Sequence, residues 1–268
     1  MRRPWLLAAL LALIAIGFFG YQVIAPRSHV LAPPRASNGV DYVLYVHVPA
    51  ACRLGGCHAL YVLDGLAWIP TFAGIEDALI ARHRIEPVIL VGIGYRDALN
   101  TGDLRKHDFT PAFGREPNVT GGADAFLSVL RDELIPYAEA HLPIAPGERG
   151  LAGHSYAGLF AAYTLAQMPD LFDRYLIMSP ALWFDDGQIY DVPYARAEHS
   201  RFVFLAADTP RGEARSDMAN NTLRLNDLLL GQQDLQVSHA LIIGETHNSM
   251  VAPAAQRGML ALYGAEAQ

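Results

Sequence analysis

The sequence lacks the patterns that mark several classes of protein. Its 268 residues contain no fixed-period repeat, no low-complexity stretch and no dense block of Lys and Arg. The 20 Lys and Arg are outnumbered by 27 Asp and Glu, and the formal net charge is −7. This balance gives nucleic-acid binding little support. The histidines and carboxylates show no recognisable metal-ligand spacing, so we expect neither a metal nor another cofactor.

A nucleotide-binding loop is also missing. Gly92 and Gly94 follow an apolar run, as they would in a dinucleotide-binding fingerprint. Asp97 stands where the third glycine of that fingerprint belongs, and no helix pattern begins there. The sequence therefore excludes this class of site.

Cysteine is scarce, with Cys52 and Cys57 alone. A metal site would need more ligands, and only His58 is adjacent. Two free thiols are the alternative to pairing, but in an exported protein a local disulfide between the two cysteines is the first expectation. No cysteine lies near the end of the N-terminal apolar run, which excludes a lipoprotein.

Residues 1–25 are predicted to be an export segment. Arg2 and Arg3 precede an apolar run with no polar face, which argues against a buried core helix. About 20 apolar residues are enough to span a bilayer, and Pro26 directly follows a cleavage-like Val-Ile-Ala. We therefore favour an uncleaved anchor over a cleaved signal, with the domain in the periplasm at the inner membrane. Membrane contact is expected through this segment only.

Residues 40–268 are expected to form one α/β domain, after a linker over residues 26–39 that contains Pro, Ser, Asn and Gly. Strand and helix patterns alternate, which predicts a mainly parallel sheet with helices on both faces. We expect strands at 41–48, 59–63, 87–95, 150–152, 174–178, 201–207 and 235–243. We expect helices at 68–84, 122–141, 158–168, 213–230 and 249–264, and a long loop at 96–120.

The most informative motif surrounds Ser155. The run Gly153-His-Ser-Tyr-Ala157 fits the G-x-S-x-G nucleophile elbow, with alanine at the second small position. In an elbow, a sharp turn between a strand and a helix holds a strained serine with its hydroxyl exposed above the sheet. The motif alone is weak, but an apolar strand precedes it and an apolar helix follows it. We therefore predict a catalytic nucleophile rather than a structural turn serine.

A serine nucleophile needs a base, and three histidines follow it in the chain. His199 precedes a predicted strand, at the wrong edge of the sheet, and His239 lies inside the last strand. His247 comes directly after that strand, where its side chain can reach the elbow, and it is the predicted base.

The third member of the site is less well defined. Asp208 ends the predicted strand 201–207 and is the candidate acid, with Glu213 and Asp217 further along. A solvated loop carboxylate or a helix cap explains Asp208 nearly as well. The oxyanion hole needs two backbone N–H groups, which we assign to Tyr156 and to Leu66, in the turn after an early strand. An ordinary strand-to-helix turn is the alternative for Leu66.

The order of motifs resembles the enterochelin-esterase-like branch of the α/β-hydrolase esterase superfamily. The matching segments are 61–65, 91–96, 108–111, 121–122 with 126–127, 133–137, 150–156 with 158–160, 179–183 and 244–247. The resemblance implies an α/β-hydrolase fold and serine hydrolysis of esters, including linear and cyclic catecholate siderophores. Some similar members rely on a Ser–His pair with no well-placed acid, which weakens the case for Asp208. Ala157 and the Cys52–Cys57 loop depart from the family pattern.

The substrate itself is not readable from these residues. Tyr95, Arg96 and Trp183 are our candidates for substrate contact, and Arg105, Lys106 and Phe184 could also contribute. The expected partner is a small-molecule ester, and a siderophore fits the resemblance. Two alternatives stay open because one scaffold serves many functions: an esterase or acyltransferase for other small acyl esters, and a non-catalytic ligand-binding protein.

Overall fold

A computed structural model of the chain describes residues 27–53, 56–97, 101–113, 121–212 and 216–264. The expected export segment at residues 1–25 lies outside these ranges. In the part of the chain that is described, no helix combines the length and the apolar character needed to cross a bilayer.

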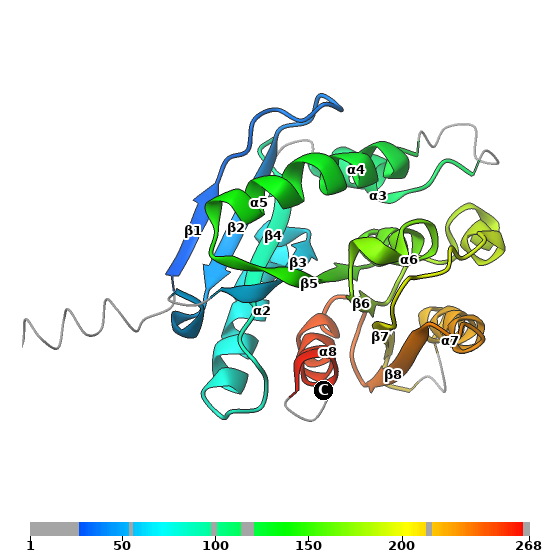
Figure 1. Ribbon diagram of the computed structural model, residues 1–268. Helices are drawn as coiled ribbons and strands as arrows, with labels where there is room; N and C mark the ends of the chain where they lie inside the picture. Colours follow the sequence, from blue (N-terminus) through cyan, green and yellow to red (C-terminus); the bar gives the residue numbers. More distant parts are fainter. Residues whose placement is uncertain (1–26, 54–55, 98–100, 114–120, 213–215, 265–268) are drawn as a thin grey trace, which may run out of the picture.

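An eight-stranded sheet forms the centre of the molecule (Figure 1). In chain order its strands are β1 (Arg27–Leu31), β2 (Tyr42–Val48), β3 (Cys57–Leu63), β4 (Ile89–Tyr95), β5 (Ile144–His154), β6 (Arg174–Met178), β7 (Arg201–Thr209) and β8 (Leu235–Ile243). Their order across the sheet is β1-β2-β4-β3-β5-β6-β7-β8. β2 runs antiparallel to β1 and β4, and every other pair is parallel. The predicted mainly parallel sheet is confirmed.

Helices cover both faces of the sheet (Figure 1). On one face lie α2 (Gly65–Ile80) and α8 (Val251–Tyr263). The other face carries α3 (Thr101–Phe109), α4 (Ala123–Val129), α5 (Ile135–His141), α6 (Tyr156–Gln167) and α7 (Asp217–Leu230). A π-helical segment, Leu130–Leu134, joins α4 to α5, and 3-10 turns form at Ala50–Arg53, Pro169–Leu171 and Phe184–Asp191.

Each face has its own apolar core, because successive side chains of a strand point to opposite faces. In β3, Leu60 packs beneath α2 and α8, whereas Tyr61 packs into the core beneath α3 to α7. Since both faces are covered, the central strands are buried along almost their whole length.

Two predicted irregular segments contain regular structure. Residues 27–31 of the expected linker form β1, paired along its length with β2. Prolines and a glycine flank these five residues, so the sequence pattern of 26–39 indicated a linker rather than a strand. Residues 101–109 of the expected loop form α3, which has few apolar side chains and so no helical periodicity. It is held by tertiary contacts: buried Asp108 accepts hydrogen bonds from Tyr42 Oη (2.6 Å) and Tyr95 Oη (3.2 Å).

The predicted disulfide between Cys52 and Cys57 is present, with the two Cα atoms 5.3 Å apart. It closes the turn between β2 and the start of β3. Cys52 is fully buried, so the bridge also ties this turn to the core.

Candidate active site

Ser155 occupies a strained turn between β5 and α6. Its φ and ψ are 61° and −120°, in the region that non-glycine residues avoid. The turn is held in place because the Ser155 N–H donates to Met178 O (3.1 Å) and the Ser155 carbonyl accepts from Ala181 N (3.0 Å). At Gly153, a Cβ would lie 2.1 Å from the Ala157 carbonyl oxygen. Only glycine fits there, which explains the small residue in the motif.

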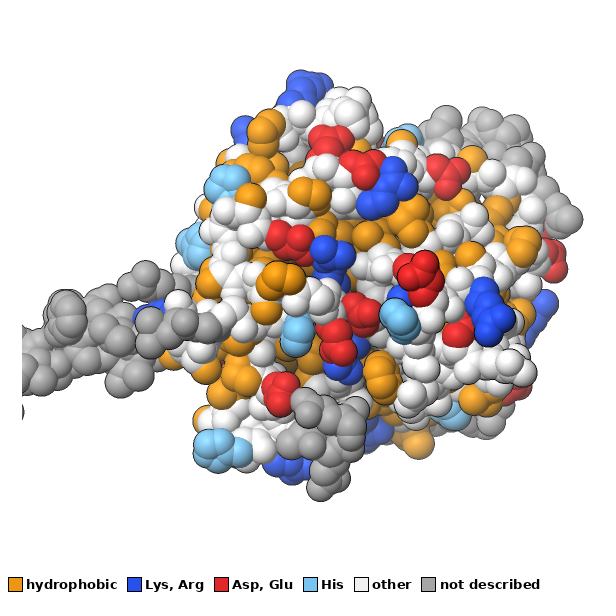
Figure 2. Space-filling model, viewed as in Figure 1, with side chains coloured by type: hydrophobic (Ala, Val, Ile, Leu, Met, Phe, Trp, Pro, Cys, Tyr) orange, Lys and Arg blue, Asp and Glu red, His pale blue; other side chains and the backbone are white. Residues whose placement is uncertain are grey.

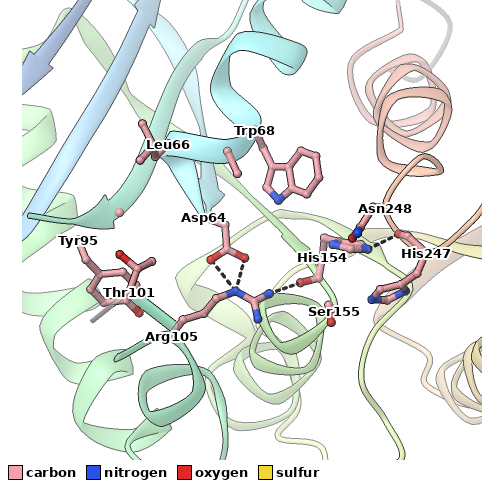
Figure 3. A pocket seen from close by; sticks show the side chains of 12 residues that line it. Asp64, Leu66, Trp68, Tyr95, Thr101, Arg105, His154, Ser155, His247 and Asn248 are labelled. Atoms are coloured by element: carbon pink, nitrogen blue, oxygen red, sulfur yellow. Dashed lines mark hydrogen bonds and ion pairs between the residues drawn. The ribbon is translucent and has the colours of Figure 1, made fainter. Parts of the chain in front are cut away.

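A cavity of about 400 Å³ opens above this turn, at the carboxyl ends of the parallel strands, where ligands bind in open α/β sheets. Figure 3 shows the residues around it, with Ser155 and His247 together on one side. The lining residues come from the loops and helix ends that follow β3, β4, β5 and β8: Asp64, Leu66, Ala67, Trp68, Gly94, Tyr95, Thr101, Arg105, His154, Ser155, His247 and Asn248.

His247 lies in the loop after β8, as predicted, and its ring contacts Asp208. The His247 Nδ1 atom is 3.4 Å from Asp208 Oδ1, which is long for a hydrogen bond. The same Asp208 oxygen accepts a hydrogen bond from the buried Ser179 hydroxyl at 2.6 Å, and the Asp208 N–H donates to Ser179 Oγ at 3.0 Å. Asp208 is thus fastened more tightly to Ser179 than to His247.

The carboxyl group of Asp208 is ionised in this setting. Burial alone raises its pKa, but the hydrogen bonds from His247 and Ser179 outweigh burial and hold the pKa below its usual value. A charged carboxylate beside Nδ1 favours the tautomer that carries its proton there. The other ring nitrogen, Nε2, is then a free proton acceptor.

His154 supports His247 from behind. Its Nε2 atom donates to the His247 carbonyl oxygen at 2.8 Å, and the two rings lie 4.5 Å apart. Burial, together with neighbouring His247, lowers the pKa of His154 to about 4. His154 is therefore a neutral donor at physiological pH and fixes the backbone of the loop that carries His247.

The first turns of two helices, α6 and α2, begin beside Ser155 and at its cavity. Tyr156 begins α6 and Leu66 lies in the first turn of α2, where N–H groups have no acceptor inside the helix. Helix N-termini also carry partial positive charge. A Cβ on Gly65 would lie 2.3 Å from the Gly92 backbone, so the start of α2 sits directly against β4. This close approach holds the start of α2, with Leu66 in the cavity wall, against the sheet.

An ion pair links the parts of the site. The Arg105 Nε atom of α3 lies 2.8 Å from both Asp64 carboxylate oxygens, and its Nη2 donates to the His154 carbonyl at 3.2 Å (Figure 3). The guanidinium also covers the Tyr156 ring at 5.6 Å. Burial raises the pKa of Asp64, and Arg105 opposes that rise. The pair joins α3, the turn before α2 and the elbow into one unit.

Comparison with known proteins agrees with this geometry. The family model described as "Putative esterase" matches residues 36–221, well over half of the chain. The chain belongs to this esterase family. It is therefore a hydrolase by family, and the expected enterochelin-esterase-like branch is confirmed by relatives that are siderophore esterases.

Two curated relatives and one solved structure illustrate the likeness. The esterase is 28% identical over 234 residues to the siderophore triacetylfusarinine C esterase of Aspergillus fumigatus, covering 75% of this chain and 79% of that one. It is 27% identical over 227 residues to the ferri-bacillibactin esterase BesA of Bacillus subtilis, covering 76% and 78%. The structure of siderophore hydrolase EstB from Aspergillus nidulans superposes with a TM-score of 0.77 at 23% identity, covering 90% and 94%, and confirms the α/β-hydrolase fold.

The predicted substrate contacts of the esterase fall in three different places. Tyr95 lines the cavity, with its hydroxyl bound to Asp108. Trp183 does not line it; its half-exposed ring packs 6.0 Å from the Tyr156 ring. Arg96 was a wrong prediction: its N–H donates to Asp41 O at 2.9 Å and its guanidinium turns toward Pro33, outside the cavity. Arg96 directly follows β4, and its backbone bond to Asp41 continues the pairing of β4 with β2, which directs its side chain away from the cavity.

Several groups in the site did not emerge from the sequence as site residues. His154 precedes the serine directly, and Ser179 opens the Ser-Pro-Ala-Leu-Trp segment, so their positions in motifs were available signals. Arg105 was considered only as a residue of a long loop, because α3 was not predicted. Nothing in the local pattern pairs Arg105 with Asp64, which is 41 residues away.

Proposed function

We propose that the esterase cleaves carboxylic esters through an acyl-enzyme on Ser155, with His247 as the base. The observation that carries this proposal is the strained Ser155 turn at a cavity that also holds His247 and two helix N-termini. An exposed hydroxyl, a free imidazole nitrogen and unpaired N–H groups are the three parts that acyl transfer requires.

In the proposed mechanism, the Ser155 Oγ attacks the ester carbonyl carbon while His247 Nε2 takes the hydroxyl proton. The Leu66 and Tyr156 N–H groups stabilise the negative oxygen that forms. His247 then gives its proton to the alcohol oxygen as the ester C–O bond breaks. Water then attacks the acyl carbon while His247 takes its proton; the bond between that carbon and Ser155 Oγ breaks, and His247 returns the proton to Oγ as the acid leaves.

Asp208 has a secondary part in this mechanism. Its charge favours the protonated Nδ1 of His247 and stabilises the imidazolium. Because the Nδ1–Oδ1 distance is 3.4 Å and the oxygen already accepts a bond from Ser179, the contribution is weaker than in a tight triad. These contacts support a site that works mainly as a Ser155–His247 dyad, with Asp208 as a weak third member.

We also propose a siderophore ester as the substrate class. Two relatives support this choice, because their names describe esterases of triacetylfusarinine C and of ferri-bacillibactin. Among the described residues that line the cavity, Arg105 is the cation, and Trp68 and Tyr95 are aromatic, a chemistry suited to electron-rich aryl arms (Figure 3).

A direct test is labelling of the full chain with a fluorophosphonate probe, followed by mass spectrometry of the peptides. The adduct is expected on the peptide that contains Ser155, and Ser155→Ala should lose both labelling and hydrolysis of p-nitrophenyl acetate. Exposed Ser128, replaced by alanine, is the control and should change neither. Labelling that persists in Ser155→Ala would contradict the nucleophile.

Substrate class is tested on the same protein with ferric and iron-free catecholate trilactones. Ser155-dependent opening of a trilactone supports the siderophore assignment. Turnover of simple esters alone would favour an esterase for other acyl groups. Tight trilactone binding with neither turnover nor labelling would favour the non-catalytic alternative.

The cellular location remains a proposal: an inner-membrane anchor over residues 1–25, with the esterase domain in the periplasm. The apolar run and its two preceding arginines support it, and the Cys52–Cys57 disulfide suits an oxidising compartment. Fractionation tests the anchor, since a cleaved protein starting near residue 26 would be released by osmotic shock.

A further inference from the structure

A second cavity, of about 250 Å³, lies on the α2 face of the sheet beside the first. The side chains of Val30, Tyr45, Leu66, Ile69 and Pro70 form most of its wall. No Asp, Glu, Lys or Arg occurs among the described residues that line it. The cavity is thus apolar, and both Val30 (58% exposed) and Leu66 (61% exposed) leave apolar surface open to solvent.

Glycines of β4 shape this second cavity. A Cβ on Gly92 would lie 2.2 Å from Ile69 Cγ1, and a Cβ on Gly94 would lie 2.9 Å from Tyr45 Cε2. Ile69 and Tyr45 therefore pack directly on the backbone of β4, where Gly92 and Gly94 have no side chains. Val30 pairs with Tyr45, and Tyr45 pairs with Gly92, so these residues form one row across β1, β2 and β4.

The two cavities lie next to each other and share Leu66 in their walls. Leu66 lines both, and Gly94, which lines the catalytic cavity, is covered by the Tyr45 ring of the apolar one. Leu66 and Tyr45 thus stand between the proposed oxyanion hole and the apolar surface.

The direction of the ester decides which part of a substrate reaches the apolar cavity. His247 protonates the departing alcohol, so the alcohol must point toward His247, which follows β8 at one edge of the sheet. The acyl part leaves the carbonyl carbon in the opposite direction. That direction runs over β4 and β2 toward β1 at the other edge, where the apolar cavity lies.

We propose that this apolar cavity is the acyl-side subsite of the esterase and takes an aliphatic or aromatic arm of the substrate. The inference rests on the proposed serine mechanism and adds to it the side of the ester that is recognised. It predicts a preference for long or aromatic acyl groups that depends on Val30.

The test compares p-nitrophenyl acetate with p-nitrophenyl hexanoate, using the full chain in lipid nanodiscs so that no detergent fills the cavity. Each fully buried methylene contributes roughly fourfold to kcat/KM, so hexanoate should exceed acetate by about tenfold or more even in an open groove. Val30→Asp and Val30→Trp, one polar and one bulky, should each reduce this ratio about fivefold or more, because burial of the chain is lost. Acetate turnover should stay within about twofold.

Leu230→Asp is the matched control, since Leu230 is 60% exposed at the end of α7, on the other face of the sheet. It should leave the ratio unchanged. The inference is overturned if Ser155-dependent acetate hydrolysis persists and both Val30 variants keep the wild-type ratio. It is also overturned if wild type shows no preference for hexanoate over acetate. Absence of any Ser155-dependent hydrolysis would instead refute the proposed function itself.

Discussion

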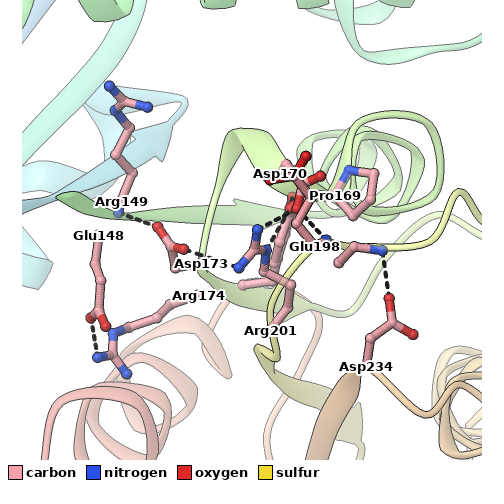
Figure 4. A network of polar contacts seen from close by, with 11 residues as sticks. Glu148, Arg149, Pro169, Asp170, Asp173, Arg174, Glu198, Arg201 and Asp234 are labelled. Carbon is pink, nitrogen blue, oxygen red and sulfur yellow. Dashed lines mark hydrogen bonds and ion pairs between the residues drawn. The ribbon is translucent and has the colours of Figure 1, made fainter.

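The two ends of the parallel strands use polar residues in opposite ways. We call the row of their carboxyl ends the carboxyl edge of the sheet and the row of their amino ends the amino edge. At the carboxyl edge, Asp64, Ser155 and Ser179 all have positive φ, and polar groups face an open cavity. At the amino edge, Arg201 is 4% exposed and every guanidinium nitrogen has an acceptor (Figure 4). The carboxyl edge thus combines strained backbone with an open cavity, whereas at the amino edge the Arg201 guanidinium is fully paired.

The amino-edge network holds neighbouring strands together. Arg201 of β7 donates to Pro169 O (3.0 Å), to Asp173 Oδ1 (3.2 Å) and to Asp170, and the second Asp173 oxygen accepts from Arg149 N of β5 (2.9 Å). Such closure stabilises the fold but leaves no group free to react. Strained backbone around an open cavity separates the reactive edge from the structural one, although both are rich in charged residues.

On the face drawn in Figure 2, the charged side chains of the described residues show no comparable concentration. Figure 2 shows Lys and Arg side chains scattered among Asp and Glu on the face drawn, with hydrophobic side chains between them.

The sharpest way to test the comparison is to remove one histidine from each edge. His247→Ala should lower kcat by about three to six orders of magnitude, as loss of a catalytic base does, with little change in stability. His199→Ala, at an exposed position of the amino edge, should leave kcat near wild type. Rates come from p-nitrophenyl acetate hydrolysis. A nearly silent His247 variant would redirect the search for the base to His239.

The next effect is on stability and belongs to the amino edge. Arg201→Met should cost about 1–3 kcal/mol of the free energy of unfolding, because the Pro169 carbonyl and the partly exposed Asp170 and Asp173 lose a buried hydrogen-bond donor. The folded fraction should keep its kcat. Thermal unfolding measures the loss, and exposed Arg196, replaced by methionine, is the control with little expected change. Loss of kcat in fully folded Arg201→Met would show that the two edges are not independent.

A smaller effect is expected from Asp208. Asp208→Asn should lower kcat by about tenfold to a hundredfold, below the roughly 10⁴-fold cost in a tight triad, because its contact with His247 is long. Asp217→Asn, exposed at the start of α7, is the control and should be silent. Steady-state rates decide the matter. A 10⁴-fold loss would show that Asp208 is a full member of a triad.

The sequence predicted best where a pattern is local. The strand bounds 174–178 and 235–243 coincide with β6 and β8, since continuous apolar or alternating runs define them. Ser155 and His247 were placed together by topology, because both follow strands whose carboxyl ends share one edge. The helix α3 was missed because its stability comes from Tyr42 and Tyr95 hydrogen bonds that no local pattern reveals. Choosing Arg96 over Arg105 followed from that miss.

The smallest expected effect on kcat concerns His154. Its ring is hydrogen-bonded to the His247 carbonyl, as Arg201 is to its partners, although His154 lies at the carboxyl edge. Burial lowers its pKa from an ordinary 6.5 to about 4, so the folded state binds fewer protons than the unfolded state between these values. The stability that neutral His154 provides is therefore complete above about pH 6.5 and is lost as pH falls toward 4. Wild type should lose on the order of 2–3 kcal/mol in that window through this residue.

His154→Gln separates this titration from the hydrogen bond. The glutamine amide can still donate to the His247 carbonyl but cannot be protonated, so the variant should keep its free energy of unfolding better than wild type from pH 6.5 to 4. Its kcat at pH 7 should stay within about tenfold of wild type, because a donor still fixes the loop, whereas His154→Leu should lose more. Unfolding measured at pH 7 and pH 4 for all three proteins provides the comparison. Equal pH dependence in wild type and His154→Gln would mean that His154 is not the group that titrates, and equal kcat in the Gln and Leu variants would mean that its hydrogen bond does not position His247.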